Sequence, residues 1–263
     1  MGLHIGFTER GDGGLDLSWT RRLNEVDGVI VVTKNLTHPK TRDAILKASE
    51  QVPIIVHATT TGMGSSPIEP CVPHPTQQLD ALASLIEAGF PVERVVLRVD
   101  PIIPTSECVH AAGSVIAGAI QRGILPGARL RISVIDGYPH VSQRFREAGL
   151  KPFYEDGRRQ PNEEELRLVA GMLAHYIPKA GGVAYACAEP VLSAMCADMG
   201  INLQAQGCLS VQDLELMGID PALAPTRVNG QNRHGCLCLT CKTELLSRRK
   251  PCPHGCLFCY WRG

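Results

Sequence analysis

Residues 28–62 read GVIVVTKNLTHPKTRDAILKASEQVPIIVHATTTG, and this stretch decides the fold class of the chain. Two short runs rich in β-branched residues, Gly28–Thr33 and Pro53–Ala58, enclose a longer amphipathic stretch, Pro39–Glu50. Buried parallel strands joined by a helix that covers one face of their sheet have this alternation. Residues 28–62 therefore predict a βαβ unit.

The same alternation continues on both sides of that unit. Further strands are predicted at Leu3–Phe7, Arg94–Val99, Arg129–Ile135 and Gly182–Ala186. Further helices are predicted at Thr76–Ala88, Cys108–Arg122, Val141–Ala148, Glu163–Ile177, Pro190–Met199 and Val211–Met217. Six strands with intervening helices favour an α/β fold of the partial TIM-like (β/α)6 barrel type, although a doubly wound open sheet has the same pattern.

The chain changes character after residue 200. Residues 201–263 are rich in Gly, Pro and Cys, and apart from the short helix they lack strand or helix periodicity. Such a segment buries too little apolar surface to hold itself together unless a metal cross-links it. We therefore expect a barrel over residues 1–200 and an irregular cysteine-rich segment over residues 201–263, packed on the barrel as one compact unit.

Small polar clusters follow nearly every predicted strand. They are Thr8–Asp12, Thr33–Asn35, Thr59–Gly62, Arg98–Pro101, Asp136–Tyr138 and Cys187–Glu189. Any one of them, taken alone, is better explained by a turn or a helix cap. Parallel α/β folds place their chemistry at the carboxyl edge of the sheet, where all of these clusters would meet. Their recurrence predicts a functional site at that edge.

The composition is that of a neutral chain with material for one sizeable core. The 263 residues include 26 basic and 26 acidic side chains, so no overall charge attracts the chain to duplex DNA or to an anionic membrane. No apolar run approaches the length of a membrane span, and the first residues lack the apolar core of a signal peptide. We expect a cytoplasmic protein with no membrane partner. Of its 11 cysteines, six lie between Cys236 and Cys259, and cysteines clustered in this way indicate metal binding or chemistry rather than disulfides.

Three cysteines stand close together in the string PCPHGCLFCYWRG. Cys252, Cys256 and Cys259 have the spacing C-x3-C-x2-C. Three thiolates on one tight loop can bind three irons of a [4Fe-4S] cluster and leave the fourth iron open to a chelating ligand. If that ligand is S-adenosylmethionine, an electron delivered to its sulfonium releases a 5′-deoxyadenosyl radical. The spacing therefore predicts a catalytic iron–sulfur site in the cysteine-rich segment.

Zinc is the competing interpretation of the same region. The pairs Cys238-x2-Cys241 and Cys256-x2-Cys259 are separated by fourteen residues, which is close to a zinc-ribbon spacing. That arrangement would leave Cys252 and the neighbouring Cys236 without a role. On this interpretation the chain is a non-catalytic, zinc-stabilised binding module on an α/β scaffold.

Further cysteines are available for a second, fully ligated [4Fe-4S] cluster, which needs four thiolates. Cys187 follows a predicted strand, Cys208 follows Gly207 in an irregular segment, and Cys236 and Cys238 flank a single leucine. These four could converge, with Cys241 as an alternative ligand. The competing interpretation is that Cys187 is a small buried apolar side chain, as many intracellular cysteines are.

The loop of Cys252, Cys256 and Cys259 resembles that of the radical S-adenosylmethionine enzymes. Their triad has the same spacing and an aromatic residue before the last cysteine, here Phe258. The resemblance implies a [4Fe-4S] cluster, S-adenosylmethionine as cofactor, Phe258 near the adenine, and flavodoxin or ferredoxin as electron donor. In those enzymes the triad follows the first barrel strand, whereas here it follows the last predicted helix, so we expect a circularly permuted barrel.

The order of motifs along most of the chain also resembles an uncharacterised bacterial family, that of the domain of unknown function 1848. The matching pieces are RGD (10–12), VTKN (32–35), TTTG (59–62), EP (69–70), LRVDPII (97–103), ISVIDGY (132–138), CAE (187–189), GC (207–208), CLC (236–238) and CPHGCLFCY (252–260). Gly11 departs from the threonine that is usual in the first piece. Because Cys187, Cys208, Cys236 and Cys238 coincide with cysteines of that pattern, we choose them as ligands of the auxiliary cluster.

Roles for other residues follow from the expected position of this site. Arg98 could pair with the methionine carboxylate, and Thr59, Thr60 and Thr61 could donate hydrogen bonds to the amino-acid or ribose portion of S-adenosylmethionine. The carboxylates expected on ribose, on the sulfonium side or on substrate are Asp100, Asp136 and Glu189. The residues expected around the substrate are Arg10, Asp12 and Lys34, and Tyr138 is expected to return or relay a hydrogen atom.

The expected substrate is an organic molecule from which hydrogen is abstracted, with a rearrangement or modification to follow. The string HGCLFCY is similar to the cluster loop of spore photoproduct lyase-type proteins, which implies a pyrimidine base, free or in nucleic acid. The cluster Arg248-Arg249-Lys250 would then be a local phosphate-binding patch. A small metabolite or a peptide fits the same residues equally well.

Overall fold

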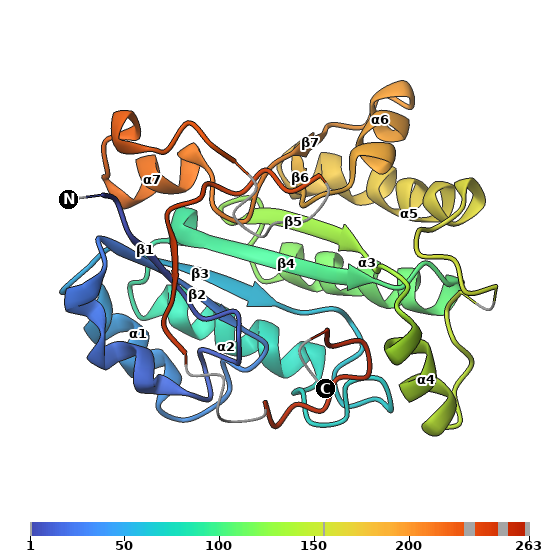
Figure 1. The fold of residues 1–263 in the computed structure, drawn as a ribbon, viewed down its shortest axis with the longest axis horizontal. Helices are drawn as coiled ribbons and strands as arrows, with labels where there is room; N and C mark the ends of the chain where they lie inside the picture. The colour runs from blue at the N-terminus through green and yellow to red at the C-terminus, as the bar shows by residue number, and fades with distance from the viewer. Residues whose placement is uncertain (1, 155, 229–234, 247–251, 261–263) are drawn as a thin grey trace.

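The computed structural model describes residues 2–154, 156–228, 235–246 and 252–260, and Figure 1 shows their arrangement. Eight parallel strands form one sheet in the order β7-β6-β5-β4-β3-β2-β1-β8. The strands are β1 (Ile5–Phe7), β2 (Gly28–Thr33), β3 (Ile54–Thr59), β4 (Val95–Ile102), β5 (Arg129–Val134), β6 (Ala184–Ala186), β7 (Leu203–Ala205) and β8 (Lys242–Glu244). The protein is therefore an α/β protein, as its sequence predicts.

Helices alternate with most of these strands. They are α1 (Thr41–Ser49), α2 (Pro75–Glu87), α3 (Ser106–Gln121), α4 (Pro139–Glu147), α5 (Glu163–Tyr176), α6 (Pro190–Asp198) and α7 (Val211–Met217). Several begin at side chains that satisfy the free backbone amides of the first turn: Asn162 and Glu165 form a capping box on α5, and Ser210 and Asp213 form one on α7. No helix among the described residues is long and apolar enough to cross a membrane.

The two faces of the sheet are covered differently. Alternate residues of the central strands, such as Val56 and Leu97, pack against α1, α2, α3, α5 and α6 in the main core. Residues of the opposite parity, such as Ile55 and Val96, pack against Leu214 and other apolar residues of the segment that contains α7. Period-two alternation in the strands produces this division. Toward the carboxyl ends, the second face carries polar and charged side chains.

The strands β7 and β8 lie in the region that the sequence predicts to be irregular, and that prediction is wrong for them. Their sequences, LQA and KTE, have three residues each and carry no recognisable periodicity. They form because the sheet offers them partners: Ala186 of β6 pairs with Ala205, and Phe7 of β1 pairs with Glu244. The pairing order ends at these two strands, so the described residues show an eight-stranded parallel sheet rather than a closed barrel.

Candidate metal and cofactor site

A cavity of about 670 Å³ lies at the carboxyl edge of β1 to β4, where the segment 252–260 returns to the sheet. This volume lies within the range of small-molecule sites. Its lining comes from the loop after β1 (9–12), from the ends of β2, β3 and β4, and from most residues between Cys252 and Tyr260. Among the residues predicted for the site, those that line it are Arg10, Asp12, Lys34, Thr59, Arg98, Asp100, Cys252, Cys256, Phe258 and Cys259.

All three cysteines of the triad line this one cavity. Cys256 is buried, Cys259 is partly buried and Cys252 is exposed. The loop that carries them is tied to the segment after β3, because the amide of Leu257 donates to the carbonyl of Ile68 at 3.0 Å. The three thiols therefore share one compartment, which opens to solvent at Cys252.

The histidine between the first two cysteines holds the loop in place. His254 Nε2 lies 2.7 Å from Asp12 Oδ2, and both side chains are buried. Its Nδ1 lies 3.1 Å from the carbonyl oxygen of Cys71. Burial favours the neutral forms, but the hydrogen bond and charge between the partners lower the pKa of Asp12 and raise the pKa of His254. The pair is therefore ionic and joins the cysteine loop to the loop after β1.

Asp12 uses its whole carboxylate in this linkage. Besides the bond to His254, Oδ1 accepts from the hydroxyl of Thr33 at 2.6 Å and from the amide of Gly14 at 2.8 Å, and Oδ2 accepts from the amide of Lys34 at 2.7 Å. Asp12 lines the cavity, as expected of a substrate residue, yet its contacts are those of an anchor. His254 was not among the residues predicted for the site, although its position between two cysteines of the motif indicated a place near the cavity.

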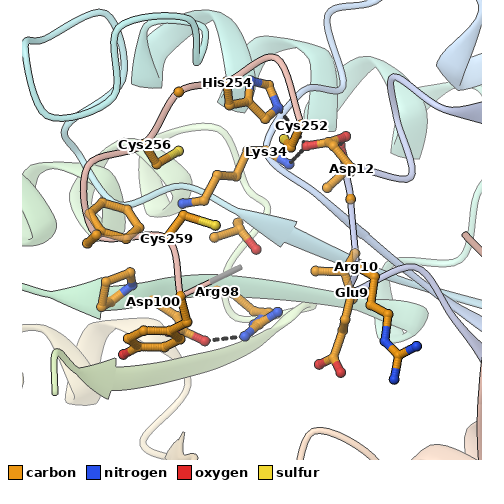
Figure 2. A pocket seen from close by; sticks show the side chains of 18 of the residues that line it. Glu9, Arg10, Asp12, Lys34, Arg98, Asp100, Cys252, His254, Cys256 and Cys259 are labelled. Atoms are coloured by element: carbon orange, nitrogen blue, oxygen red, sulfur yellow. Dashed lines mark hydrogen bonds and ion pairs between the residues drawn. The ribbon is translucent and has the colours of Figure 1, made fainter. Parts of the chain in front are cut away.

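A buried lysine and glutamate lie beside the middle cysteine. Lys34 Nζ is 2.7 Å from Glu69 Oε1, and the other oxygen of Glu69 accepts a hydrogen bond from Thr61. The thiol of Cys256 lies 3.7 Å from Glu69 Oε1. The ammonium of Lys34 is also 5.1 Å from the centre of the Phe258 ring and points toward the thiols of Cys256 and Cys259 in Figure 2. From the sequence, Glu69 was only part of the EP motif and had no predicted role. The structure adds it to the site as the partner of Lys34.

Burial controls the ionisation of this group. It raises the pKa of Cys256 to about 12, with the charge of Lys34 opposing the rise. Burial also opposes the charge of Lys34, but Glu69 and Cys256 more than compensate and raise the pKa of that lysine. A metal would have to displace the proton of Cys256, and the cation next to it would stabilise the resulting thiolate.

Arg98 and Asp100 form an ion pair on the next strand. The second oxygen of Asp100 accepts from the hydroxyl of Ser133 at 3.1 Å. Burial opposes the charge of Arg98, but the carboxylate of Asp100 outweighs this effect and raises the pKa of Arg98 above its ordinary value. The Nε of Arg98 and the hydroxyl of Thr59 are buried and make no hydrogen bond within the described part of the chain. Two polar groups at the cavity are thus free to bind a ligand.

The remaining predicted residues lie outside the lining of the cavity. Thr61 donates to Glu69, which in turn is paired with the lining residue Lys34, and the hydroxyl of Thr60 is buried with no hydrogen bond to a described residue. Asp136 accepts from Gln160, and Glu189 accepts from the backbone amide of Val134 at 2.9 Å.

Tyr138 is separated from the cavity by one aromatic ring. Its ring packs edge-on against Tyr260, which does line the cavity, at 4.9 Å between centroids. The predicted basic cluster 248–250 lies outside the described residues.

The four cysteines chosen for an auxiliary cluster come together at a second place, which we call the quartet: Cys187, Cys208, Cys236 and Cys238. Cys187 follows β6 and Cys208 follows the neighbouring β7, so the parallel pairing brings their sulfurs to 3.3 Å. The amide of Cys208 lies 3.1 Å from the sulfur of Cys238. Three members of the quartet are buried and Cys187 is partly buried.

The cysteines of the quartet are tightly packed, and hydrogen bonds link their thiols. Gly207 allows the close approach, since a Cβ atom there would lie 2.5 Å from the amide nitrogen of Cys238. Hydrogen bonds with Cys187 and Cys208 lower the pKa of Cys238, whereas hydrogen bonds with Cys208 and Cys238 raise the pKa of Cys187. Cys241 is not part of the quartet: it packs in the apolar cluster of β1 and α7, and its carbonyl accepts from Ile5.

The zinc-ribbon pairing is not formed in the structure. Cys238 belongs to the quartet, whereas Cys256 and Cys259 line the cavity with Cys252. Within the described ranges, no group of three or more His, Cys, Asp and Glu side chains is placed to hold a metal ion. A cubane cluster takes one thiolate on each of its four irons, or three where one iron is left to another ligand. Three thiols on one cavity and four in one enclosed group fit the donor sets of two such clusters.

Comparison with known proteins gives a family but no activity. No curated protein matches the chain. One solved structure, titled "Structure of Proline Utilization A (PutA) from Corynebacterium freiburgense", is similar over 82% of this chain at 14% identity and a TM-score of 0.35, and the match spans only 25% of that protein. So weak a likeness carries no argument. The family described as "Domain of unknown function (DUF1848)" matches residues 18–261, and the chain therefore belongs to the DUF1848 family.

Proposed function

We propose that this chain is a radical S-adenosylmethionine enzyme with a [4Fe-4S] cluster on the triad and a second on the quartet. The observation that supports it most is the convergence of Cys252, Cys256 and Cys259 on one cavity at the carboxyl edge of a parallel sheet. Three ligands leave one position of a cubane cluster open, and four ligands close it. The open site would be catalytic and the closed one auxiliary.

The triad would hold the first cluster, with Lys34 beside it as a compensating cation. When bound, such a cluster supplies the electron that cleaves S-adenosylmethionine to a 5′-deoxyadenosyl radical. The parallel sheet would be the partial barrel expected from the sequence, with the triad brought to it from residues 252–259 instead of from the first strand. Flavodoxin or ferredoxin is the proposed source of the electron.

Several side chains of the cavity suit the binding of S-adenosylmethionine. The free Nε of Arg98 and the hydroxyl of Thr59 can donate hydrogen bonds to its carboxylate or ribose. Asp100, held by Arg98 and Ser133, can accept from a ribose hydroxyl or face the sulfonium. Phe258 offers an aromatic face next to the triad for the adenine.

The substrate would be an organic molecule that enters beside the loop after β1. Glu9 and Arg10 of that loop line the cavity and carry charges that can orient it. Tyr138 would act on a hydrogen atom through Tyr260, whose ring it contacts and which lines the cavity. A nucleobase remains our proposal for the substrate class, and it rests on the resemblance of the cluster loop alone.

Anaerobic purification with iron and sulfide analysis tests this proposal. We expect about eight irons per chain in the wild type and 5′-deoxyadenosine after addition of dithionite and S-adenosylmethionine. The variants Cys256→Ala/Cys259→Ala and Cys236→Ala/Cys238→Ala are each expected to retain about four irons. Cys241→Ala is the matched control and is expected to retain about eight.

The opposite result identifies the alternative class of protein. A colourless chain with stoichiometric zinc, and no 5′-deoxyadenosine under any of these conditions, would make it a zinc-stabilised binding module and would overturn the proposal.

A further inference from the structure

Arg131 is a fully buried arginine in the middle of β5. None of its side chain is exposed, and it points to the same face of the sheet as the quartet. Its guanidinium donates to Gln206 Oε1 at 2.6 Å and to the carbonyl of Cys208 at 3.4 Å, and lies 3.4 Å from His57 Nε2. Its Nε makes no hydrogen bond to a described residue. Every one of these contacts is with a neutral group.

The cations around Arg131 are each paired with a carboxylate. Arg98 is paired with Asp100, Lys242 Nζ lies 2.8 Å from Glu9, and Arg129 Nη1 lies 2.8 Å from Asp213. Arg131 has no such partner in the described part of the chain.

His57 does not supply the missing charge. Burial and the nearby charge of Arg131 hold the pKa of His57 well below its ordinary value, so this histidine is neutral and Arg131 keeps an uncompensated positive charge.

A buried charge without a counter-ion is strongly unfavourable, and proteins retain one only where something compensates it. Two of the contacts of Arg131 lead to the quartet, which becomes anionic when its thiols are deprotonated to bind a cluster. Arg131 bonds to the carbonyl of Cys208 and, through Gln206, to the turn that places this cysteine.

We propose that Arg131 is the buried counter-cation of the quartet: its charge compensates the anionic thiolate-ligated group held there and raises the reduction potential of that group. The inference rests on the second cluster of the proposed function. A nearby positive charge favours the reduced form of a cluster, which carries one more negative charge than the oxidised form. Arg131 is thus a positioning and charge-compensating residue, not one that touches the substrate.

The test is a redox titration of the whole, iron-loaded protein followed by electron paramagnetic resonance. Arg131→Met removes the charge, and Arg131→Gln keeps a hydrogen-bonding side chain without the charge. Both are expected to shift the redox equilibrium of the quartet cluster toward the oxidised form by about tenfold or more. For a one-electron couple, a tenfold shift lowers the reduction potential by about 59 mV. Arg131→Lys, which keeps the charge, is expected to stay close to the wild type.

The matched control is the double variant Arg129→Met/Asp213→Asn. It removes a buried arginine from the same strand and face together with its carboxylate, so no charge is left unpaired. We expect the potential of the quartet cluster to change less than in Arg131→Met. The triad cluster, identified by its loss in Cys256→Ala/Cys259→Ala, serves as the internal reference.

The outcomes separate this inference from the proposed function. If wild-type chains hold about eight irons and Arg131→Gln titrates like the wild type, the role of Arg131 is refuted and the enzyme class stands. If Arg131→Lys shifts the potential as far as Arg131→Gln, the effect comes from geometry and the charge role is refuted. If Cys236→Ala/Cys238→Ala changes neither iron content nor spectrum, the quartet binds no cluster, and both the second cluster and this inference fall.

Discussion

The triad and the quartet are both built from cysteines, but they are built in opposite ways. The triad lies within eight residues of one loop, faces a cavity and leaves Cys252 exposed. The quartet draws on three separate segments between residues 187 and 238, and most of its sulfur is buried. An open three-ligand site suits an exchangeable ligand, whereas an enclosed four-ligand site suits a group that stays in place. The contrast teaches that the carboxyl edge of one sheet can carry both an open and an enclosed group of cysteines.

Removing one cysteine from each site gives the largest expected effects. Cys256→Ala should abolish the formation of 5′-deoxyadenosine, because the cluster that we propose to bind S-adenosylmethionine would lose a ligand. Cys238→Ala should lower the iron content but leave some cleavage of S-adenosylmethionine, measured by chromatography with dithionite as reductant. Equal loss of 5′-deoxyadenosine in both variants would break the distinction between the two sites.

Asp12→Asn tests whether the buried ion pair positions the triad alone. The carboxamide cannot balance the charge of His254, so the cysteine loop loses its anchor to the loop after β1. Loss of such a supporting partner typically lowers metal affinity by about 10-fold to 100-fold. Chelator competition should show this loss for the triad irons and none for the quartet irons, and Asp16→Asn, at the partly buried N-cap of the 3-10 helix Leu17–Arg21, is the control.

Gly207→Ala tests the close packing of the quartet. The added Cβ would lie 2.5 Å from the backbone nitrogen of Cys238, so the backbone must move. We expect the free energy of unfolding to fall by about 1–3 kcal/mol and the quartet irons to be lost first. Gly171→Ala, in an open position on α5, is the matched control and should raise stability by about 0.5–1 kcal/mol. A stable Gly207→Ala with full iron would show that the enclosure is looser than described.

The buried histidines of the two regions should respond to pH in opposite directions. Burial and Arg131 lower the pKa of His57, so the unfolded chain binds an extra proton below about pH 6.5 and stability falls on acidification, by up to about 1.4 kcal/mol per pH unit. Burial alone would lower the pKa of His254, but the hydrogen bond and the charge of Asp12 raise it. Protonated His254 therefore stabilises the folded chain fully below about pH 6.5. This stabilisation is lost as the pH rises through the raised pKa of His254 in the folded chain.

Urea unfolding of the metal-free chain across this pH range measures both effects. His57→Gln should flatten the acid side of the stability curve, and His254→Gln should flatten the alkaline side. A curve that is unchanged by either substitution would contradict the ionisation states described for that histidine.

Most of the fold was predictable because it depends on local patterns. The strand Gly28–Thr33 and the helix Val211–Met217 have the predicted bounds, and other elements differ by a few residues at their ends. The prediction failed for β7 and β8, whose three residues carry no periodic signal and which exist only because the sheet has edges to pair with. Glu69 and His254 were missed for a similar reason, since their importance comes from Lys34 and Asp12, which lie far away in the sequence.

The sequence by itself determined the α/β class and the spacing of the triad, because both are recorded in residues that are neighbours along the chain. Only the tertiary structure decided that Cys187, Cys208, Cys236 and Cys238 form one group and that Cys241 does not. It also decided that Arg131 has no carboxylate partner among the described residues. Those facts depend on which strands pair, and pairing is set by burial and hydrogen bonding between segments that no local pattern connects.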